Sequence, residues 1–239
     1  KTEIIAGITT FMTMGYILAV NPDILSKTGM DKGGVFTATA VSAIIATLIM
    51  AFYANYPFAL APGMGLNAFF TYSVVLGMGK SWQFALTAVF IEGIIFILLS
   101  FFKVREAIFD AIPMNLKKAV SVGIGLFIAL IGFANSGVIV PGDGIIVDLG
   151  AITTAGPLLT LIGLIITGIL LAKNVRGALL IGMLVTTIIG IPMGVTQLPS
   201  KIAQLPPSIA DVAFQFEWSQ IFTKEMLLVV FTFLFVDVF

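Results

Sequence analysis

Two acidic side chains lie inside long apolar stretches, Glu92 in TAVFIEGIIF and Asp237 in FLFVDVF. A charged side chain at the centre of a bilayer costs about 2.5–3.5 kcal/mol, so such residues face the protein interior and usually serve a function. The apolar stretches contain no Lys or Arg that could pair with them. Because carboxyl groups bind and release protons, Glu92 and Asp237 are candidates for proton coupling. A structural hydrogen bond between helices is the alternative for Glu92.

A third polar group follows an interrupted apolar stretch, YPFALAPGMGLNAFFTY (56–72), which holds two prolines and two glycines within nine residues. Pro62 removes a backbone donor and disfavours helix at the preceding residue, while glycine permits non-helical dihedrals. The sequence therefore predicts a broken helix that restarts near Met64–Leu66 with free N–H groups and a positive dipole end. Lipid tolerates such a break only where it is buried or lines a cavity, and secondary transporters build substrate sites this way. The structural alternative is a kinked span packed through small residues.

Asn67 comes directly after this break. Its carboxamide can both donate and accept hydrogen bonds, so it is a candidate substrate contact. Its structural alternative is to satisfy carbonyl groups left free by the unwound backbone. Phe69 and Phe70 could stack on a flat ring, although most of the 21 phenylalanines are expected to serve packing.

The composition predicts an integral membrane protein. Hydrophobic residues make up 59% of the 239 residues and charged residues 10%, whereas soluble domains carry about 25% charged residues. The mean hydropathy is +1.13. The net charge is zero, which gives no electrostatic footprint for nucleic acid. The absence of His and Cys removes imidazole and thiolate metal sites and any His-based triad, so neither an enzyme nor a cofactor is expected.

The expected fold is an all-α polytopic bundle of seven spans followed by an eighth apolar run. Two short surface segments are expected at Ala107–Pro113 and Ile209–Trp218. The run from Met226 is too short to cross a bilayer at ~1.5 Å per residue, so the chain is expected to be a fragment that ends inside a helix. The expected spans are Ile4–Val20, Val35–Tyr53, a broken third span ending near Gly77–Gly79, Phe84–Phe102, Ala119–Ala134, Pro157–Ala172 and Ala178–Val195.

The basic residues of the loops indicate the orientation. The segment 103–118 carries four of them and the segment 135–156 none, which favours a cytoplasmic N-terminus in a multi-pass protein of the cell membrane. An odd number of spans would insert a following copy upside down, as in the inverted repeats of many transporters.

Four runs, AGITTFMTMGYILAVNP (6–22), APGMGLNAFFTY (61–72), TAVFIEGIIFILLS (87–100) and FLFVDVF (233–239), resemble the AzgA-like adenine, guanine and hypoxanthine permeases, which are allied to the nucleobase/ascorbate transporter family. The resemblance covers almost the whole chain. It implies two inverted seven-span repeats, with a core domain that moves against a gate domain while a proton accompanies the base. The further acidic residue and the tenth-span glutamate of the family do not occur in this chain, which alone is not expected to transport.

The resemblance also implies domains and site residues. Residues 1–102 would form core spans 1–4, residues 103–196 gate spans 5–7, residues 197–225 a connecting loop, and residues 226–239 the start of core span 8. The third span could include a short extended segment. The implied substrate contacts are Gly65, Leu66, Asn67, Phe70 and Asp237. Glu92 and Asp237 are expected to couple the proton.

Two rival functions stay open at this point. An anion carrier for sulfate or bicarbonate could use the same architecture, because a helix N-terminus also suits an anion. A non-transporting membrane scaffold or receptor is the rival from another class. The expected partners are a purine base, a proton and the lipid bilayer. The oligomeric state is not given by the sequence, and a homodimer is kept as one option.

Overall fold

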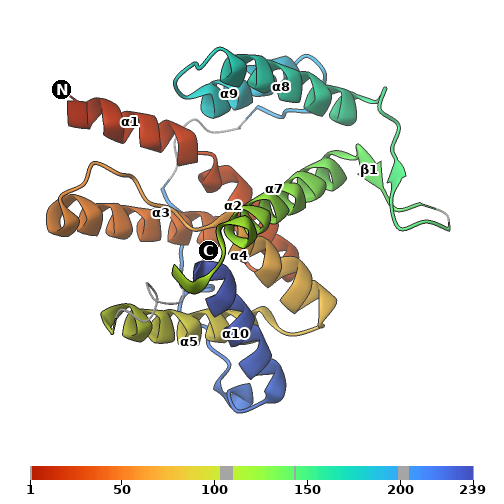
Figure 1. The fold of residues 1–239 in the computed structure, drawn as a ribbon. Coiled ribbons are helices and arrows are strands. Elements are labelled where there is room, and N and C mark those ends of the chain that lie inside the picture. Colours follow the sequence, from red (N-terminus) through yellow and green to blue (C-terminus); the bar gives the residue numbers. More distant parts are fainter. Residues whose placement is uncertain (1, 103–109, 143, 199–204, 239) are drawn as a thin grey trace. The chain divides into compact units, whose positions relative to one another are not determined.

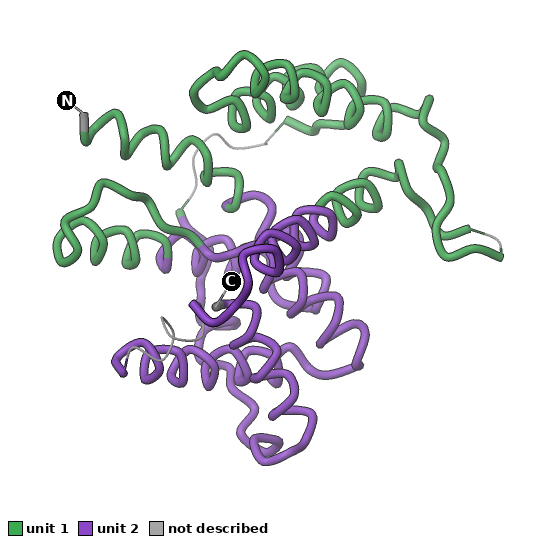
Figure 2. Tube along the Cα trace, in the orientation of Figure 1, with its two compact units in different colours: residues 1–17, 43–61, 129–205 green, residues 18–42, 62–128, 206–239 purple. Residues whose placement is uncertain are grey.

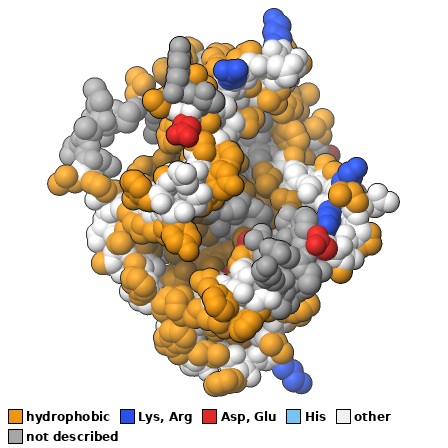
Figure 3. All heavy atoms as spheres, turned by 60° about the vertical axis from the view of Figure 1, so that its left-hand side comes forward, with side chains coloured by type: hydrophobic (Ala, Val, Ile, Leu, Met, Phe, Trp, Pro, Cys, Tyr) orange, Lys and Arg blue, Asp and Glu red, His pale blue; other side chains and the backbone are white. Residues whose placement is uncertain are grey.

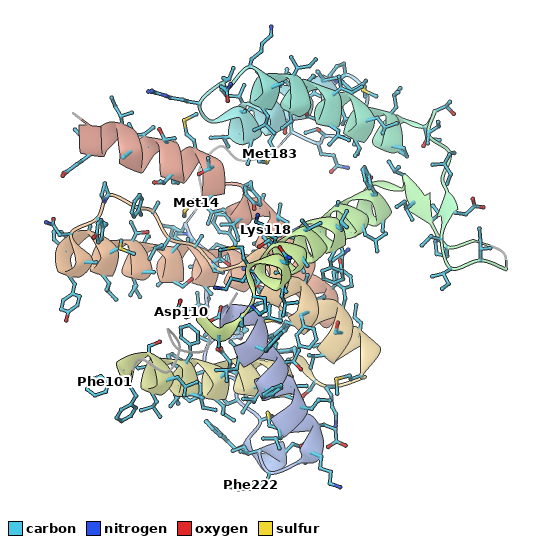
Figure 4. The ribbon with its side chains drawn as sticks, viewed as in Figure 1. Met14, Phe101, Asp110, Lys118, Met183 and Phe222 are labelled. Carbon is cyan, nitrogen blue, oxygen red and sulfur yellow. The ribbon has the colours of Figure 1, made fainter. Side chains whose placement is uncertain are left out.

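The computed structural model describes residues 2–102, 110–142, 144–198 and 205–238, and these are largely helical (Figure 1). Within these residues, five helices are long and apolar enough to cross a membrane: Glu3–Thr28, Lys32–Ala54, Trp82–Phe101, Met114–Ser136 and Ala155–Ala172. Hydrophobic side chains cover much of the face shown in Figure 3, with few charged groups among them. Large apolar side chains such as Phe101 and Phe222 are 82% and 102% exposed and project away from the helices (Figure 4). An apolar surface of this kind suits a multi-pass membrane protein.

The helices follow the expected spans with some changes of boundary. The helical elements are α1 (Thr2–Met14), α2 (Ile17–Leu25), η1 (Ser26–Thr28), α3 (Lys32–Ile49), η2 (Met50–Ala54), α4 (Met64–Ala68), η3 (Phe69–Gly77), α5 (Trp82–Phe101), α7 (Met114–Ser136), α8 (Ala155–Ala172), α9 (Ala178–Gly190), η4 (Trp218–Gln220) and α10 (Lys224–Val238). A two-stranded antiparallel hairpin, β1 (Ile139–Val140) with β2 (Asp148–Leu149), lies between α7 and α8.

The prediction that the first span ends at Val20 is wrong. α2 continues through Pro22 to Leu25, and the helix breaks earlier, at Gly15 and Tyr16. Asn21 is only 3% exposed, and both polar atoms of its side chain form hydrogen bonds to other helices. A buried polar residue with partners need not mark a loop, which is why the boundary was misplaced.

The predicted break of the third span is confirmed. Residues 55–63 are not helical, Gly63 is extended (φ −75°, ψ 131°), and helix resumes at Met64. The helix then continues from α4 into the π-helical η3 and ends at Gly77, as expected. The first three N–H groups of a helix lack an intrahelical acceptor, so the restart presents backbone donors at residues 64–66.

The structure divides into two compact units (Figure 2). Unit 1 is Lys1–Ile17, Ala43–Ala61 and Ala129–Leu205, and unit 2 is Leu18–Ser42, Pro62–Ile128 and Pro206–Phe239. The sequence-predicted boundaries of core and gate domains remain a prediction.

In unit 1, threonine hydroxyls satisfy part of the unwound backbone. The Ala59 N–H donates to Thr10 Oγ1 (3.2 Å), and the Leu60 N–H donates to Thr47 Oγ1 (3.0 Å). Backbone groups in a membrane need partners inside the protein, and these two side chains from α1 and α3 supply them.

The helical hairpin of α8 and α9, also in unit 1, packs through small residues. A Cβ on Gly163 would lie 2.6 Å from Thr186 Oγ1, and one on Gly182 would overlap the Thr167 side chain. Each glycine therefore packs against a threonine side chain of the other helix. Such small-residue contacts let membrane helices approach closely.

Unit 2 has a hydrophobic core between α5 and α10. Ala85 and Ala88 are fully buried on α5, and Val229 and Phe233 on α10 are each 1% exposed. The alanines recur at helical spacing, so they form one small-residue face of α5 on which α10 packs. α10 also contacts α4.

The segment that leads into α10 includes the surface segment predicted at Ile209–Trp218, where Phe214 and Trp218 are 83% and 52% exposed. It consists of turns and η4, and its Val212 is 4% exposed within the core of unit 2. Glu217 fastens it to the start of α5: its N–H donates to Thr87 Oγ1 (2.8 Å), and its carboxylate accepts hydrogen bonds from Ser81 and Gln220. These hydrogen bonds lower the pKa of Glu217, and the one from Ser81 has the largest effect. The other predicted surface segment, Ala107–Pro113, lies mostly outside the described residues.

Candidate functional site

Asn67 lies on α4, one turn after the helix restarts, and its carboxamide is hydrogen-bonded to another carboxamide. Asn67 Nδ2 donates to Asn21 Oδ1 on α2 (2.7 Å). Asn21 Nδ2 donates in turn to Thr39 Oγ1 on α3 (2.8 Å), and the Thr39 hydroxyl donates to the Val35 carbonyl (2.7 Å). Asn21 and Thr39 are 3% and 4% exposed, whereas Asn67 is half-buried. The chain of bonds therefore runs from the protein interior to Asn67.

Two further contacts hold α2 and the following η1 against the restarted helix. The Thr71 hydroxyl donates to the Ile24 carbonyl (3.4 Å), and Lys27 Nζ donates to the Tyr72 hydroxyl (3.1 Å). The residue numbers rise together on both sides, from the Asn21–Asn67 pair to the Lys27–Tyr72 pair, so the two helices run parallel. The first and third spans of a chain that crosses a bilayer repeatedly are expected to run parallel, because each crossing reverses direction.

The other predicted substrate contacts take different positions around Asn67. A Cβ on Gly65 would lie 3.3 Å from Ile124 Cγ2, so α4 approaches α7 closely at this glycine. Leu66 is half-buried against the hydrophobic core of unit 2, and Phe70 is a buried member of that core (5% exposed). Phe69 packs edge-to-face on Phe233 with 5.1 Å between ring centroids. The role of these residues in binding remains a prediction.

Glu92 and Asp237, which are distant in the sequence, lie on α5 and α10, two helices that pack on each other. Glu92 is 5% exposed and shares the face of α5 that carries Ala85 and Ala88. Asp237 lies one turn beyond Phe233 on α10 and is half-buried. Within the described residues, Glu92 Oε1 is a buried oxygen without a hydrogen-bond partner.

The orphaned oxygen of Glu92 bears on the two interpretations of this residue. A carboxyl group kept for a structural hydrogen bond should use its oxygens, because an unsatisfied buried polar group costs about 1–3 kcal/mol. Unsatisfied groups of this kind are found at functional sites. The arrangement offers two carboxyl groups on helices that pack on each other, and such groups can bind and release a proton.

Sequence reasoning missed Asn21 and Thr39. The signal for Asn21 was its spacing from Ile17 and Ile24, since these three residues recur at i, i+4 and i+7 and are each 3–4% exposed. That pattern marks Asn21 as part of a buried helical face. For Thr39 the sequence held no such signal, because α3 contains several similar Thr and Ser residues.

The chain matches the model of the Permease family over residues 1–239. A protein of Methanocaldococcus jannaschii named as a permease is 51% identical over 239 residues, which are all of this chain and 55% of the relative. The guanine/hypoxanthine permease PbuG of Bacillus subtilis is 46% identical over 251 residues, with 100% of this chain and 57% of the relative covered. The adenine permease AdeP of Escherichia coli is 40% identical over 239 residues, with 100% and 54% covered.

The chain thus spans about half the length of the curated relatives it matches. The similarity extends through the interrupted third span and both membrane carboxyl groups, because it covers every residue of the chain. The resemblance to the AzgA-like permeases is confirmed, and the chain belongs to the Permease family.

Proposed function

We propose that the protein takes up purine nucleobases across the cell membrane together with a proton. The observation that carries this proposal is the similarity, along the whole chain, to permeases named for guanine/hypoxanthine and for adenine. Guanine, hypoxanthine and adenine are flat, uncharged rings with hydrogen-bond donors and acceptors at their edges. The interrupted helix and Asn67 offer groups of matching chemistry.

The site supports a neutral base through its hydrogen-bonding groups. The carboxamide of Asn67 can accept and donate toward a purine edge, and the restart at Met64 presents backbone N–H donors nearby. We assign Asn67 as the main polar contact, with Gly65 and Leu66 as backbone neighbours and Phe70 as an apolar neighbour. In the full-length protein, Asp237 would contribute from α10, which packs on α4.

Proton coupling is assigned to the pair of Glu92 and Asp237. The two carboxyl groups lie on helices that pack on each other, and within the described residues Glu92 Oε1 is buried without a hydrogen-bond partner, which leaves this oxygen available to bind a proton. A proton that enters with the substrate would change the charge of this pair between the two halves of the cycle.

The remaining assignments follow the family resemblance. We propose an elevator-type cycle in which a core domain built from spans 1–4 and 8–11 moves against a gate domain, in a fold of two inverted seven-span repeats. The N-terminus is placed in the cytoplasm, and a homodimer is kept as the assembly to test. Gly163 and Gly182, which pack α8 closely on α9, are consistent with a rigid gate element.

An anion carrier is less well supported. The two carboxyl groups on α5 and α10 would repel a sulfate or bicarbonate ion in the same unit. The named relatives transport bases according to their names, which gives an anion no support.

The test is competition of uptake in cells that lack their own purine permeases and express the full-length protein. Radiolabelled hypoxanthine should enter, and unlabelled guanine or adenine should reduce this uptake while sulfate and bicarbonate leave it unchanged. Competition by the anions would support the anion carrier. Absence of uptake, together with no rise in melting temperature on adding purines, would support a non-transporting scaffold or receptor.

A further inference from the structure

Asn21 and Thr39 have no role in the proposed function, yet they are buried and joined to Asn67. We propose that they form a positioning relay that fixes which way the Asn67 carboxamide faces and thereby sets which purine edge the site accepts. This inference rests on the proposed function, since it concerns the same site. It adds two residues on α2 and α3 that need not touch the substrate.

The direction of the relay follows from the donors and acceptors it contains. The Thr39 hydroxyl has one hydrogen, and it donates this to the Val35 carbonyl at 2.7 Å. Toward Asn21 the hydroxyl can therefore only accept, so Asn21 must turn its NH₂ group to Thr39. Asn21 is left with its carbonyl oxygen facing Asn67.

The same reasoning then fixes Asn67. A carbonyl oxygen on Asn21 requires a donor, so Asn67 must present its NH₂ group, as it does at 2.7 Å. A flipped Asn67 would set two carbonyl oxygens against each other next to a buried residue, which is unfavourable. The backbone carbonyl of Val35 thus determines, through two side chains, where the Asn67 oxygen lies.

The fixed carboxamide presents a defined pattern to a ligand. Asn67 Oδ1 accepts no hydrogen bond from the described residues, and one N–H of its NH₂ group is left after the bond to Asn21. A base that offers an N–H to this oxygen is favoured over one that offers a ring nitrogen there. Hypoxanthine and adenine differ in this way, because hypoxanthine has a donor at ring position 1 and an acceptor at position 6, and adenine has the reverse.

Burial makes the relay sensitive to single changes. Asn21 and Thr39 are 3% and 4% exposed, so water cannot readily replace a lost partner. Thr39→Val keeps the shape and removes the hydroxyl, which leaves the Asn21 NH₂ group without its acceptor and lets both carboxamides flip. Thr39→Ser keeps the hydroxyl and is the matched conservative variant.

The experiment measures the ratio of the inhibition constants of adenine and hypoxanthine for radiolabelled base uptake by the full-length protein, with uptake corrected for the amount of protein in the membrane. In Thr39→Val, the ratio should move toward one by about two- to tenfold, which is the range for one hydrogen bond. Thr39→Ser should keep the wild-type ratio. A purely structural role would lower the amount of active protein and leave the ratio unchanged.

The outcomes separate the two proposals. If Thr39→Val takes up the base with the wild-type ratio of inhibition constants, the relay is refuted and the proposed function is not affected. Absence of purine uptake by the wild-type protein overturns the proposed function and the relay with it. Should Thr39→Val fail to reach the membrane, Thr39→Ala removes the same hydroxyl, and its ratio of inhibition constants decides between the same two results.

Discussion

Phe233 is the side chain whose removal should most clearly loosen the helix that carries Asn67. It is 1% exposed, and its ring packs edge-to-face on Phe69, two residues after Asn67, with 5.1 Å between centroids. Truncation of a buried Phe to Ala costs about 3–5 kcal/mol, because the contacts around the ring are lost and a cavity remains. Those are dispersion contacts, so the cost also applies in a membrane or detergent. About 0.5–1.5 kcal/mol of it belongs to the pairing with Phe69.

The assay is the melting temperature of the detergent-purified full-length protein. A change of 1 kcal/mol shifts the melting temperature by roughly 2–4 °C in a chain of 150–250 residues and by less in a longer one, so Phe233→Ala should lower it by roughly 5–15 °C. Phe231→Ala on the same helix is the matched control, since Phe231 is 63% exposed and should change little. Equal melting temperatures for the two variants would refute the packing of α10 described above.

Three further predictions concern single residues of unit 2. Glu92→Gln keeps the shape of the side chain but cannot release a proton, so it should flatten the dependence of purine uptake on external pH; an unchanged pH profile would return Glu92 to a structural role. Gly65→Val places a branched side chain where a Cβ already lies 3.3 Å from Ile124 Cγ2, which should cost about 1–3 kcal/mol and lower the melting temperature. Ile124→Ala in the same protein should restore part of this loss, and a lack of rescue would contradict the close approach of α4 and α7. The hydrogen bond from Ser81 lowers the pKa of Glu217 below the ordinary value of 4.5, so the folded state prefers the ionised form and the attachment of the segment before α10 is complete above that value. Protease cleavage of that segment should rise in the wild-type protein as the pH falls through the folded-state pKa of Glu217. In Glu217→Gln, the cleavage should be independent of pH. Cleavage of Glu217→Gln that still depends on pH would contradict this anchoring.

Local backbone chemistry explains why the broken third span could be predicted. Proline and glycine act on the dihedrals of their own and neighbouring residues, so the interruption before Met64 can be predicted from the sequence alone. The predicted bounds of two other spans also agree with the structure to within a few residues. Val35–Tyr53 corresponds to α3 with η2, and Phe84–Phe102 corresponds to α5. Such spans can be predicted because the length and composition of an apolar run determine them.

Contacts between residues that are distant in the sequence could not be predicted from the sequence. Nothing in either motif shows that Glu92 and Asp237 lie on helices that contact each other, since this depends on how α10 packs on α5 through Ala85 and Ala88. The end of the first span was wrongly predicted at Val20 for a related reason. An Asn-Pro pair usually signals a turn, and only the tertiary contact to Asn67 makes the side chain part of a helix interior.

The central claim is that a purine is held by Asn67 at the restart of the broken helix. Equilibrium binding of radiolabelled hypoxanthine to the purified full-length protein, with and without Asn67→Ala, tests this most directly. We expect Asn67→Ala to fold, with an unchanged melting temperature in the absence of ligand. This variant should bind hypoxanthine more weakly than the wild-type protein, by a factor of up to about ten. An unchanged dissociation constant in that protein would contradict the account.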